Sequence, residues 1–306
     1  MPTLLITRED FPTSPLALRT ADPGRQAQVR AFADRQAEAA TTARDRLASL
    51  WAAATTRTDR ITALRTVHTE LVNWRYILAV EAGGRLGQSI AYDPSRFRMP
   101  IRPGNTNYDR LGRVGRLRDG AQWEPVSRTY TGGLPTPAYE AMLRYGRLAQ
   151  QRFEDEAVEG DILTTWLTLP NGRHSPGIRI IRGRTAQGIA RELTARVAAR
   201  GIDASRMETG GNPVYTATPD PRDSAAVHTA ALGLLADPGL TPESYLTARY
   251  LLFQSPQTKK GSDAVTRTFT VAVGALALGN ETPALPADID LRCYVLSQSE
   301  ALTSAA

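Results

Sequence analysis

The sequence predicts an α+β protein that is mainly helical, with a small β-sheet packed on helices. Over much of the chain, apolar residues recur at every third or fourth position, as at Ile61 and Leu64, which is typical of amphipathic helices. One stretch changes to a period of two, so that residues 161–169 and 177–181 read as paired strands around a turn at 170–172. We therefore expect a sheet made of this hairpin and one or two further strands.

The composition is that of a basic protein with a substantial core. The chain has 306 residues, of which 42% are hydrophobic. Its formal charge of +6 comes from arginine, because only two of its 37 Lys and Arg residues are lysines. Such a charge favours phosphates, nucleic acid or acidic surfaces as partners.

The single cysteine and the apolar runs set further limits. Cys293 has no second cysteine to pair with and argues against a cysteine-based zinc site, so we expect no disulfide and no metal. No apolar run is long enough for a secretory signal or a bilayer span. We expect a cytoplasmic protein with no membrane partner.

The first predicted region, residues 1–87, begins with a proline-containing arm over residues 1–22. A run rich in Ala, Arg, Gln and Glu then predicts one long helix over residues 22–51. A second helix is predicted over residues 59–84, where two glycines end it. We expect these helices to form an antiparallel hairpin.

The second region, residues 88–135, shows neither period, and its prolines and glycines predict a long loop. Aromatic residues are interleaved with its arginines, which is the composition of a surface that contacts phosphates or stacks on bases. The candidate residues are Arg98, Arg102, Arg110, Arg113 and Arg116. The alternative is a solvated loop whose arginines bond to water or backbone carbonyls. If the region is ordered over the two lysines, the two segments form one basic cleft.

The third region, residues 136–306, contains the hairpin, then a helix at 185–199 and a further strand at 212–217. Further helices are predicted over residues 136–157, 223–235, 241–253 and 265–278. The last of these is apolar nearly all round, so we expect it to be buried.

The C-terminal stretch 285–296 alternates and predicts a short strand with Asp288 and Asp290 on one face. Paired carboxylates can bind a metal or act as a base. The alternative is that both acids lie on the wet face of an edge strand.

The two lysines, Lys259 and Lys260, are neighbours in a polar loop between two predicted helices. Gly261 allows a positive φ, and Ser262 or Asp263 can cap the helix that follows. A helix start exposes unpaired amides and the positive end of the helix dipole, so the loop suits phosphate, sulfate or carboxylate. The alternative is a solvated turn in which Asp263 pairs with an arginine one turn on.

The layout of this quarter of the chain is an apolar helix, a polar loop, a second apolar helix and a proline-containing acidic segment with a tyrosine. It resembles the helix-loop-helix core of the Fic/Doc family, whose members transfer AMP or another phosphate-bearing group. Their motif is His-Pro-Phe-x-acid-Gly-Asn-Gly-Arg. With Gly261 on its first glycine, the histidine, acid, asparagine and arginine positions and a later basic position hold Pro256, Lys260, Ser262, Ala264 and Arg267. The resemblance therefore implies a degenerate, avirulence protein B-like branch without the family's histidine base.

The sequence thus favours a transferase-like enzyme or a binding protein that holds a nucleotide or another phosphorylated ligand. The predicted anion site consists of Lys259, Lys260, Gly261, Ser262 and Arg267, and the acidic candidates are Asp263, Asp288 and Asp290. An acidic protein or peptide substrate fits the same charges. No general base is evident, because none of the three histidines has a recognisable partner.

Two other functions stay open. One is a nucleic-acid-binding protein that uses the arginines of residues 96–118, and the other is a non-enzymatic scaffold protein built on the long N-terminal helices.

Overall fold

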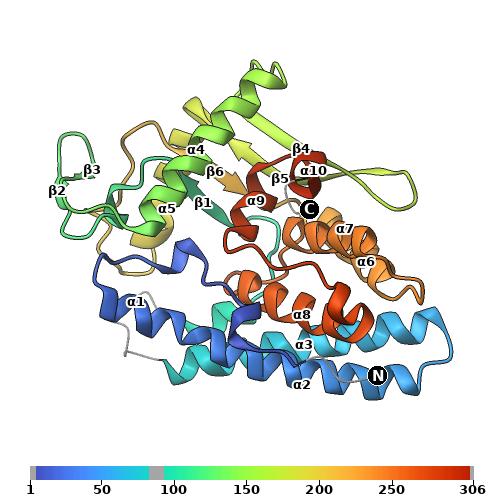
Figure 1. Ribbon diagram of the computed structural model, residues 1–306. Coiled ribbons are helices and arrows are strands. Elements are labelled where there is room, and N and C mark those ends of the chain that lie inside the picture. The colour runs from blue at the N-terminus through green and yellow to red at the C-terminus, as the bar shows by residue number, and fades with distance from the viewer. Residues whose placement is uncertain (1–4, 83–92, 304–306) are drawn as a thin grey trace.

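The computed structural model describes residues 5–82 and 93–303. They form the mainly helical α+β fold that the sequence predicts, with a four-stranded sheet and a separate two-stranded hairpin (Figure 1). The α-helices are α1 (Pro23–Arg30), α2 (Phe32–Ala52), α3 (Arg57–Glu81), α4 (Pro137–Asp155), α5 (Gly183–Ala198), α6 (Pro221–Leu235), α7 (Pro242–Gln254), α8 (Ser262–Ala277), α9 (Ile289–Val295) and α10 (Gln298–Thr303). The strands are β1 (Tyr108–Leu111), β2 (Gln122–Glu124), β3 (Thr129–Thr131), β4 (Ile162–Thr168), β5 (His174–Ile181) and β6 (Val214–Ala217). Within the described ranges, no helix is both long and apolar enough to cross a membrane.

The main sheet has the strand order β1-β6-β5-β4, and all its neighbours are antiparallel. The predicted hairpin is confirmed as β4 and β5. Gly172 turns the chain with φ +78°, and the Leu169 amide donates to the Arg173 carbonyl at 2.9 Å. The strand predicted at 212–217 is β6, whereas the fourth strand, β1, comes from the Arg-rich region, where the sequence shows no strand pattern.

The strand predicted near the C-terminus is wrong, because this stretch forms helix α9. The helix packs against both α4 and α7, so its apolar residues are buried on several sides. They therefore alternate with polar residues along the sequence as they would in a strand, although the stretch is helical. Asp288, just before the helix, accepts hydrogen bonds from Arg292 Nε at 2.6 Å and from the Tyr145 hydroxyl at 2.8 Å. Asp288 therefore anchors α9 to α4, and it does not share a strand face with Asp290.

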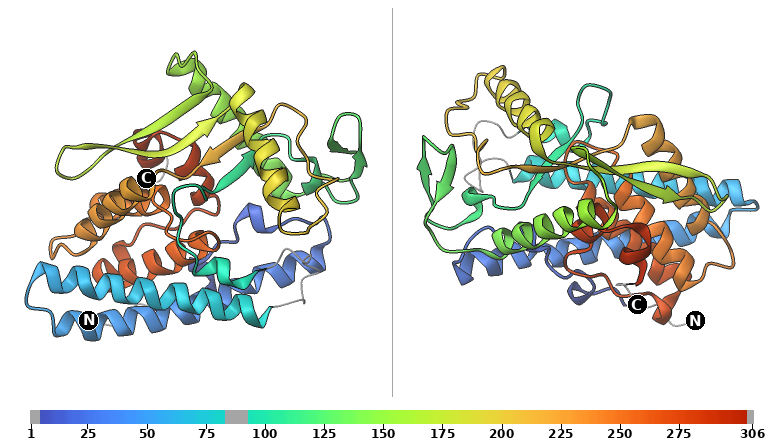
Figure 2. Two further views of the ribbon diagram at one scale, coloured as in Figure 1. Left: turned by 180° about the vertical axis from the view of Figure 1, so that it is seen from behind. Right: turned by 90° about the horizontal axis from the view of Figure 1, so that it is seen from above.

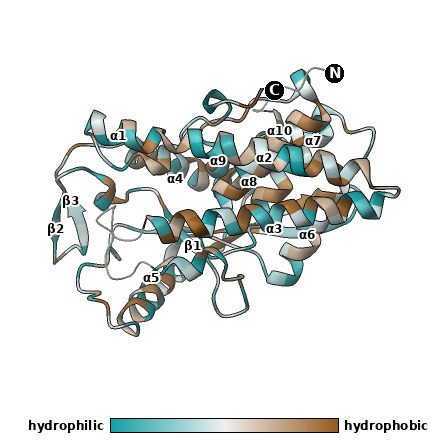
Figure 3. Ribbon diagram, turned by 90° about the horizontal axis from the view of Figure 1, so that it is seen from below, coloured by the Kyte–Doolittle hydropathy of each residue, from teal (hydrophilic) through white to brown (hydrophobic). Residues whose placement is uncertain are grey.

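Helices α2 and α3 form the predicted helical hairpin and lie side by side along one side of the molecule (Figures 1 and 3). A capping box starts α3: the Thr56 hydroxyl accepts the Asp59 amide at 3.1 Å, and the Asp59 carboxylate accepts the Thr56 amide at 2.8 Å. The two glycines predicted to end this helix lie outside the described residues. The long helix predicted before it is two helices, α1 and α2, although Ala31 between them keeps helical angles of −61° and −13°.

The main core lies between α2, α3, α6, α7 and α8. Its fully buried residues include Leu47, Leu64, Leu232, Leu251 and Phe269. Helix α8 is buried from Ala264 to Ala275, as its nearly continuous apolar sequence predicts. The sheet forms the next layer, with α4 and α9 on one face and α5 on the other (Figure 2). The region boundaries at residues 87 and 135 stay predictions.

Candidate anion-binding site

Gly261 connects the lysine loop, residues 255–261, to α8. Its φ is +75°, in the left-handed region that favours glycine. A Cβ at this position would lie 2.6 Å from a ring carbon of Phe97 and 2.9 Å from the side chain of Arg75. The loop backbone therefore packs directly against these two side chains, and only glycine leaves room for that contact.

Two hydroxyl side chains hold the loop closed around the lysines. The Ser262 hydroxyl donates to the Thr258 carbonyl at 3.1 Å and accepts the Thr258 amide at 3.2 Å. The Thr258 hydroxyl donates to the Lys260 carbonyl at 2.9 Å. Ser262 therefore acts as a structural residue of the loop in the first turn of α8.

A segment of the Arg-rich region runs antiparallel to the lysine loop. Pro100 and Thr258 form an isolated β-bridge, and the Lys259 amide donates to the Met99 carbonyl at 2.9 Å. The Lys259 ammonium group donates to the Asn105 carbonyl. This part of the Arg-rich region is thus ordered against the lysine loop. This is the arrangement under which we expect the two segments to form one basic cleft.

Arginines from several other segments lie within electrostatic range of the two lysines. Burial, followed by Arg96 and Arg196, lowers the pKa of Lys259 to about 8. Burial, and then the positive charges of Arg96 and Arg19, lower the pKa of Lys260. The group, which we call the cationic cluster, contains Lys259, Lys260, Arg19, Arg75, Arg96, Arg196 and Arg200. Because like charges are held together here, binding of an anion relieves their repulsion.

Asp109 of β1 lies within electrostatic reach of this cluster. The Asp109 side chain is exposed to water. Its pKa is raised by the protein around it and then by the negative charge of Asp263, while the positive charges of Arg19 and Lys259 lower it. Burial, and then the charge of Arg116, lowers the pKa of the exposed Arg19. Asp109, Asp263, Arg19 and Lys259 are therefore coupled electrostatically across four segments: β1, the start of α8, the N-terminal segment and the lysine loop. We call the surface where these segments meet the recess.

The recess combines two kinds of chemistry. The lysines and the first amides of α8 can hold an anion, because these amides precede the hydrogen-bonded part of the helix. Asp263 lies in the first turn of α8, where the helix dipole stabilises its carboxylate. The same negative charge repels an incoming anion. The pKa of Asp109 is raised, so its carboxylate accepts a proton more readily than that of an unperturbed aspartate.

Arg267 and Asp290 form a buried ion pair between α8 and α9. Their closest atoms are 3.3 Å apart, and their side chains are 5% and 3% exposed. Arg267 also donates to the Ala287 carbonyl at 2.7 Å and to the Pro12 carbonyl at 3.3 Å. Burial raises the pKa of Asp290 although Arg267 opposes that shift. The two terminal nitrogens of Arg267 are thus used inside the protein, and both predicted site residues serve to join α8, α9 and the N-terminal segment.

Of the predicted basic-loop arginines, Arg116 lies within electrostatic range of Arg19, and none is among the charges that lower the pKa of the two lysines. Arg110 is buried and donates to the Gly210 carbonyl at 2.6 Å, which ties β1 to residues ahead of β6. Arg98 lies 3.8 Å from the centre of the Tyr76 ring. The exposed members of the set are Arg98, Arg102, Arg113 and Arg116. The arginine of this region that joins the cluster is Arg96.

Two partly buried histidines lie beside the lysine loop. The rings of His68 and His228 are 5.0 Å apart and line a cavity of about 10 Å³ together with Ser255 and Thr266, which is room for one water molecule. Burial lowers the pKa of His68 to about 4 and that of His228 to about 3. Both are therefore neutral at physiological pH and add no charge to the recess.

The recess contains residues that sequence reasoning missed. Asp109 lies in the four-residue strand Tyr108–Leu111, whose sequence does not alternate, so no sequence signal marks it. Arg19 belongs to the predicted N-terminal arm, where nothing marks it among the other arginines of the chain. Within the described residues, no group of three or more His, Cys, Asp or Glu side chains lies where it could hold a metal ion.

Comparison of the sequence with models of known protein families gave no match. Comparison with curated protein sequences gave no match either. The resemblance to the Fic/Doc core therefore stays a prediction.

Proposed function

We propose that the chain is a cytoplasmic transferase-like enzyme that binds a phosphate-bearing ligand, such as a nucleotide, in the recess. The observation that carries the proposal is the cationic cluster, which holds two lysines and five arginines near four carboxylates, Asp93, Asp109, Glu192 and Asp263. Such a surplus of positive charge is costly unless an anion offsets it. Phosphates match it in charge and in their capacity to accept several hydrogen bonds.

The lysines and the α8 amides bind the phosphates of the donor. Their charge offsets the negative charge that grows on the departing phosphate when the bond to the transferred group breaks. Asp109 accepts the proton that an acceptor hydroxyl loses as it attacks the transferred group. If no acceptor is present, the same residues make a phosphate-binding protein without turnover.

The proposal is tested by thermal unfolding with ADP, GDP, UDP, nucleotide-sugars and a short DNA duplex. We expect at least one nucleotide-type ligand to raise the midpoint, because ligand at 100 times its Kd stabilises a protein by about 2.7 kcal/mol. The double variant Lys259→Gln/Lys260→Gln should lose this stabilisation. Arg147→Gln, which removes an exposed cation of α4 outside the cluster, should retain it.

Two results count against the proposal. The first is that no nucleotide-type ligand stabilises the parent protein. The second is that only DNA stabilises it and that this effect disappears at moderate salt, which would favour a nucleic-acid-binding protein.

A further inference from the structure

A second pocket lies outside the recess, between the end of α4, strand β4 and the turn from α9 to α10. Its volume is about 380 Å³, within the range of small ligand and side-chain sites. The residues that matter for its chemistry are Arg152, Asp155, Glu156, Thr165, Trp166 and Glu300. None of them belongs to the cationic cluster.

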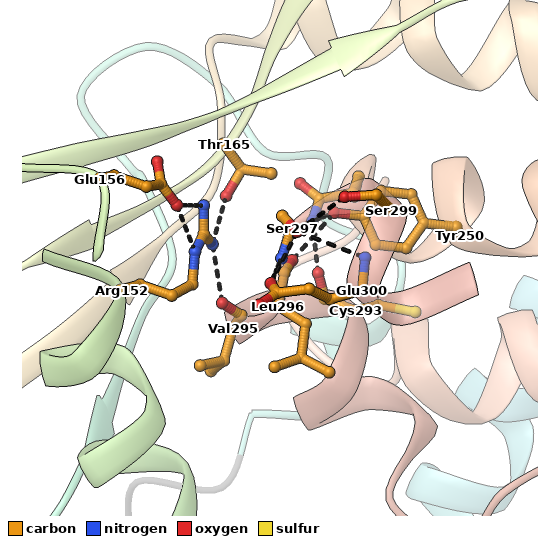
Figure 4. A network of polar contacts seen from close by, with 11 residues as sticks. Arg152, Glu156, Thr165, Tyr250, Cys293, Val295, Leu296, Ser297, Ser299 and Glu300 are labelled. Atoms are coloured by element: carbon orange, nitrogen blue, oxygen red, sulfur yellow. Dashed lines mark hydrogen bonds and ion pairs between the residues drawn. The ribbon is translucent and has the colours of Figure 1, made fainter. Parts of the chain in front are cut away.

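The one arginine of the pocket offers little charge to a ligand. The Arg152 side chain is 6% exposed, and its guanidinium lies 2.6 Å from a Glu156 oxygen. It also donates to the Val295 carbonyl at 2.7 Å and to the Thr165 hydroxyl at 3.2 Å (Figure 4). Arg152 therefore joins α4, β4 and α9, and its positive charge is used within the wall of the pocket.

The carboxylates give the pocket an excess of negative charge. Asp155, Glu156 and Glu300 all line it, against the single charge of Arg152. Hydrogen bonds from Ser297 lower the pKa of Glu300, so this carboxylate is ionised at neutral pH. A local negative charge in a chain of net charge +6 points to a cationic ligand.

Strand β4 borders this pocket and is the last strand of the sheet. Trp166 stands opposite Pro176, which has no amide hydrogen, so the Trp166 backbone groups face the outer edge of the sheet. Two residues on, the Gln298 side chain bonds the Thr168 amide at 2.8 Å and the Thr168 carbonyl at 3.2 Å, as a neighbouring strand would. Within residues 5–82 and 93–303, no strand continues this pairing beyond β4.

Strand β4 also carries large apolar side chains that are exposed to solvent. Trp166 is 63% exposed and Ile162 is 45% exposed. Helix α5 covers the neighbouring strands through Ile181 of β5 and Tyr215 of β6, whereas β4 contributes no residue to that buried group. An exposed edge with large apolar side chains is a ready template for strand addition.

We propose that the outer edge of β4 binds an extended peptide that carries an arginine or lysine side chain. The peptide backbone pairs with β4 at Trp166, which is the strand-addition mode of recognition. The cationic side chain enters the acidic pocket between Asp155 and Glu300, on the face of β4 that carries Thr165. The next peptide side chain points to the other face and packs on the exposed Trp166 indole. Charge complementarity selects a basic peptide over a neutral or acidic one.

The test uses three pools of nine-residue peptides with β-branched residues at random positions and arginine, glutamine or glutamate fixed at the centre. We expect the arginine pool to bind immobilised protein about fivefold more tightly than the glutamine pool, and the glutamate pool to bind more weakly still. Trp166→Ala and Asp155→Asn should each weaken binding of the arginine pool about fivefold to tenfold. Both side chains are exposed, so unchanged unfolding midpoints should show that the variants fold.

Glu159→Gln is the matched control, because Glu159 is an exposed acid of the same segment that does not line the pocket. It should leave the affinity within about twofold. Hydrogen exchange should show new protection of the Trp166 amide when the arginine pool is bound. Equal binding of the three pools, unchanged binding in Trp166→Ala and Asp155→Asn, or protection elsewhere would overturn the proposal.

Discussion

At the scale of single residues, Asp109 shows how function and stability are opposed in the recess. Its carboxyl group is crowded by protein and lies near Asp263, so its pKa is raised in the folded state. A raised pKa means that the folded protein holds a proton that the unfolded chain has released. The ionised form of Asp109 therefore reduces the stability of the folded state as pH rises above the ordinary value of 3.8.

The variant Asp109→Asn tests whether ionised Asp109 destabilises the folded protein. At neutral pH it should be more stable than the parent, because the amide keeps the size of the side chain and carries no charge. The difference in free energy of unfolding should shrink as the pH falls toward 3.8 and vanish well below it, where the parent carboxyl is protonated in both states. Urea unfolding at pH 7 and pH 4 measures it. A less stable variant at pH 7 would contradict this account of Asp109.

Gly261 is the second residue on which the recess depends. Gly261→Ala should destabilise the protein by about 2–4 kcal/mol, because the new Cβ meets the Phe97 ring at 2.6 Å and the left-handed conformation disfavours alanine. Gly188→Ala is the matched control, since Gly188 lies within α5 and a Cβ there meets nothing within 4 Å. This control should gain about 0.5–1 kcal/mol. Similar midpoints for the two variants in thermal unfolding would disprove the packing argument.

At the scale of elements, Gln254 fixes the end of α7 and hence the start of the lysine loop. Its fully buried side chain accepts the Ile178 amide of β5 at 2.7 Å and donates to the Cys293 carbonyl of α9. The amide group also donates to the Tyr250 hydroxyl at 3.2 Å. One glutamine thus connects α7, the sheet and α9 directly behind the candidate site.

Gln254→Leu should cost about 2–4 kcal/mol, because it leaves a buried amide and a buried carbonyl without partners. The matched control is Gln151→Leu on the exposed side of α4, which loses one surface contact to Asp155 and should change stability by about 0.5 kcal/mol or less. Chemical denaturation of both variants measures the difference. Near-equal losses would show that the buried bridge does not stabilise the fold.

The elements also show what could be predicted from the sequence. The β4–β5 hairpin and the buried α8 follow from local signals, a turn glycine and an apolar run. Strand β1 could not be predicted, because its pairing with β6 depends on residues far along the chain. The strand predicted at α9 failed since a helix enclosed by its neighbours loses its polar stripe.

The candidate site divides in the same way. Lys259, Lys260 and Gly261 could be identified because two rare lysines beside a helix start are a local signal. Asp109 and Arg19 could not, since only the folded chain brings β1 and the N-terminal segment to the lysine loop. Arg267 has the right spacing for an anion ligand, but its position one and a half turns into a buried helix commits it to internal contacts.

At the scale of the whole molecule, the charges are separated into a basic recess and an acidic edge. The recess joins segments from the beginning, middle and end of the chain, whereas the acidic pocket lies at the outer strand of the sheet. The phosphate site and the peptide site that we propose therefore lie on different parts of the molecule and use different charges.

The most direct test is calorimetric titration of ADP at pH 7.5 and pH 9. Lys259 has a pKa of about 8, so it is mostly protonated at the lower pH and mostly neutral at the higher one. We expect ADP to bind more tightly at pH 7.5, and Lys259→Gln/Lys260→Gln to weaken binding at this pH at least about tenfold and to remove the pH dependence. Equal ADP affinity in the parent and the double variant, or no binding by the parent, would contradict the central claim that the cationic cluster is a phosphate site.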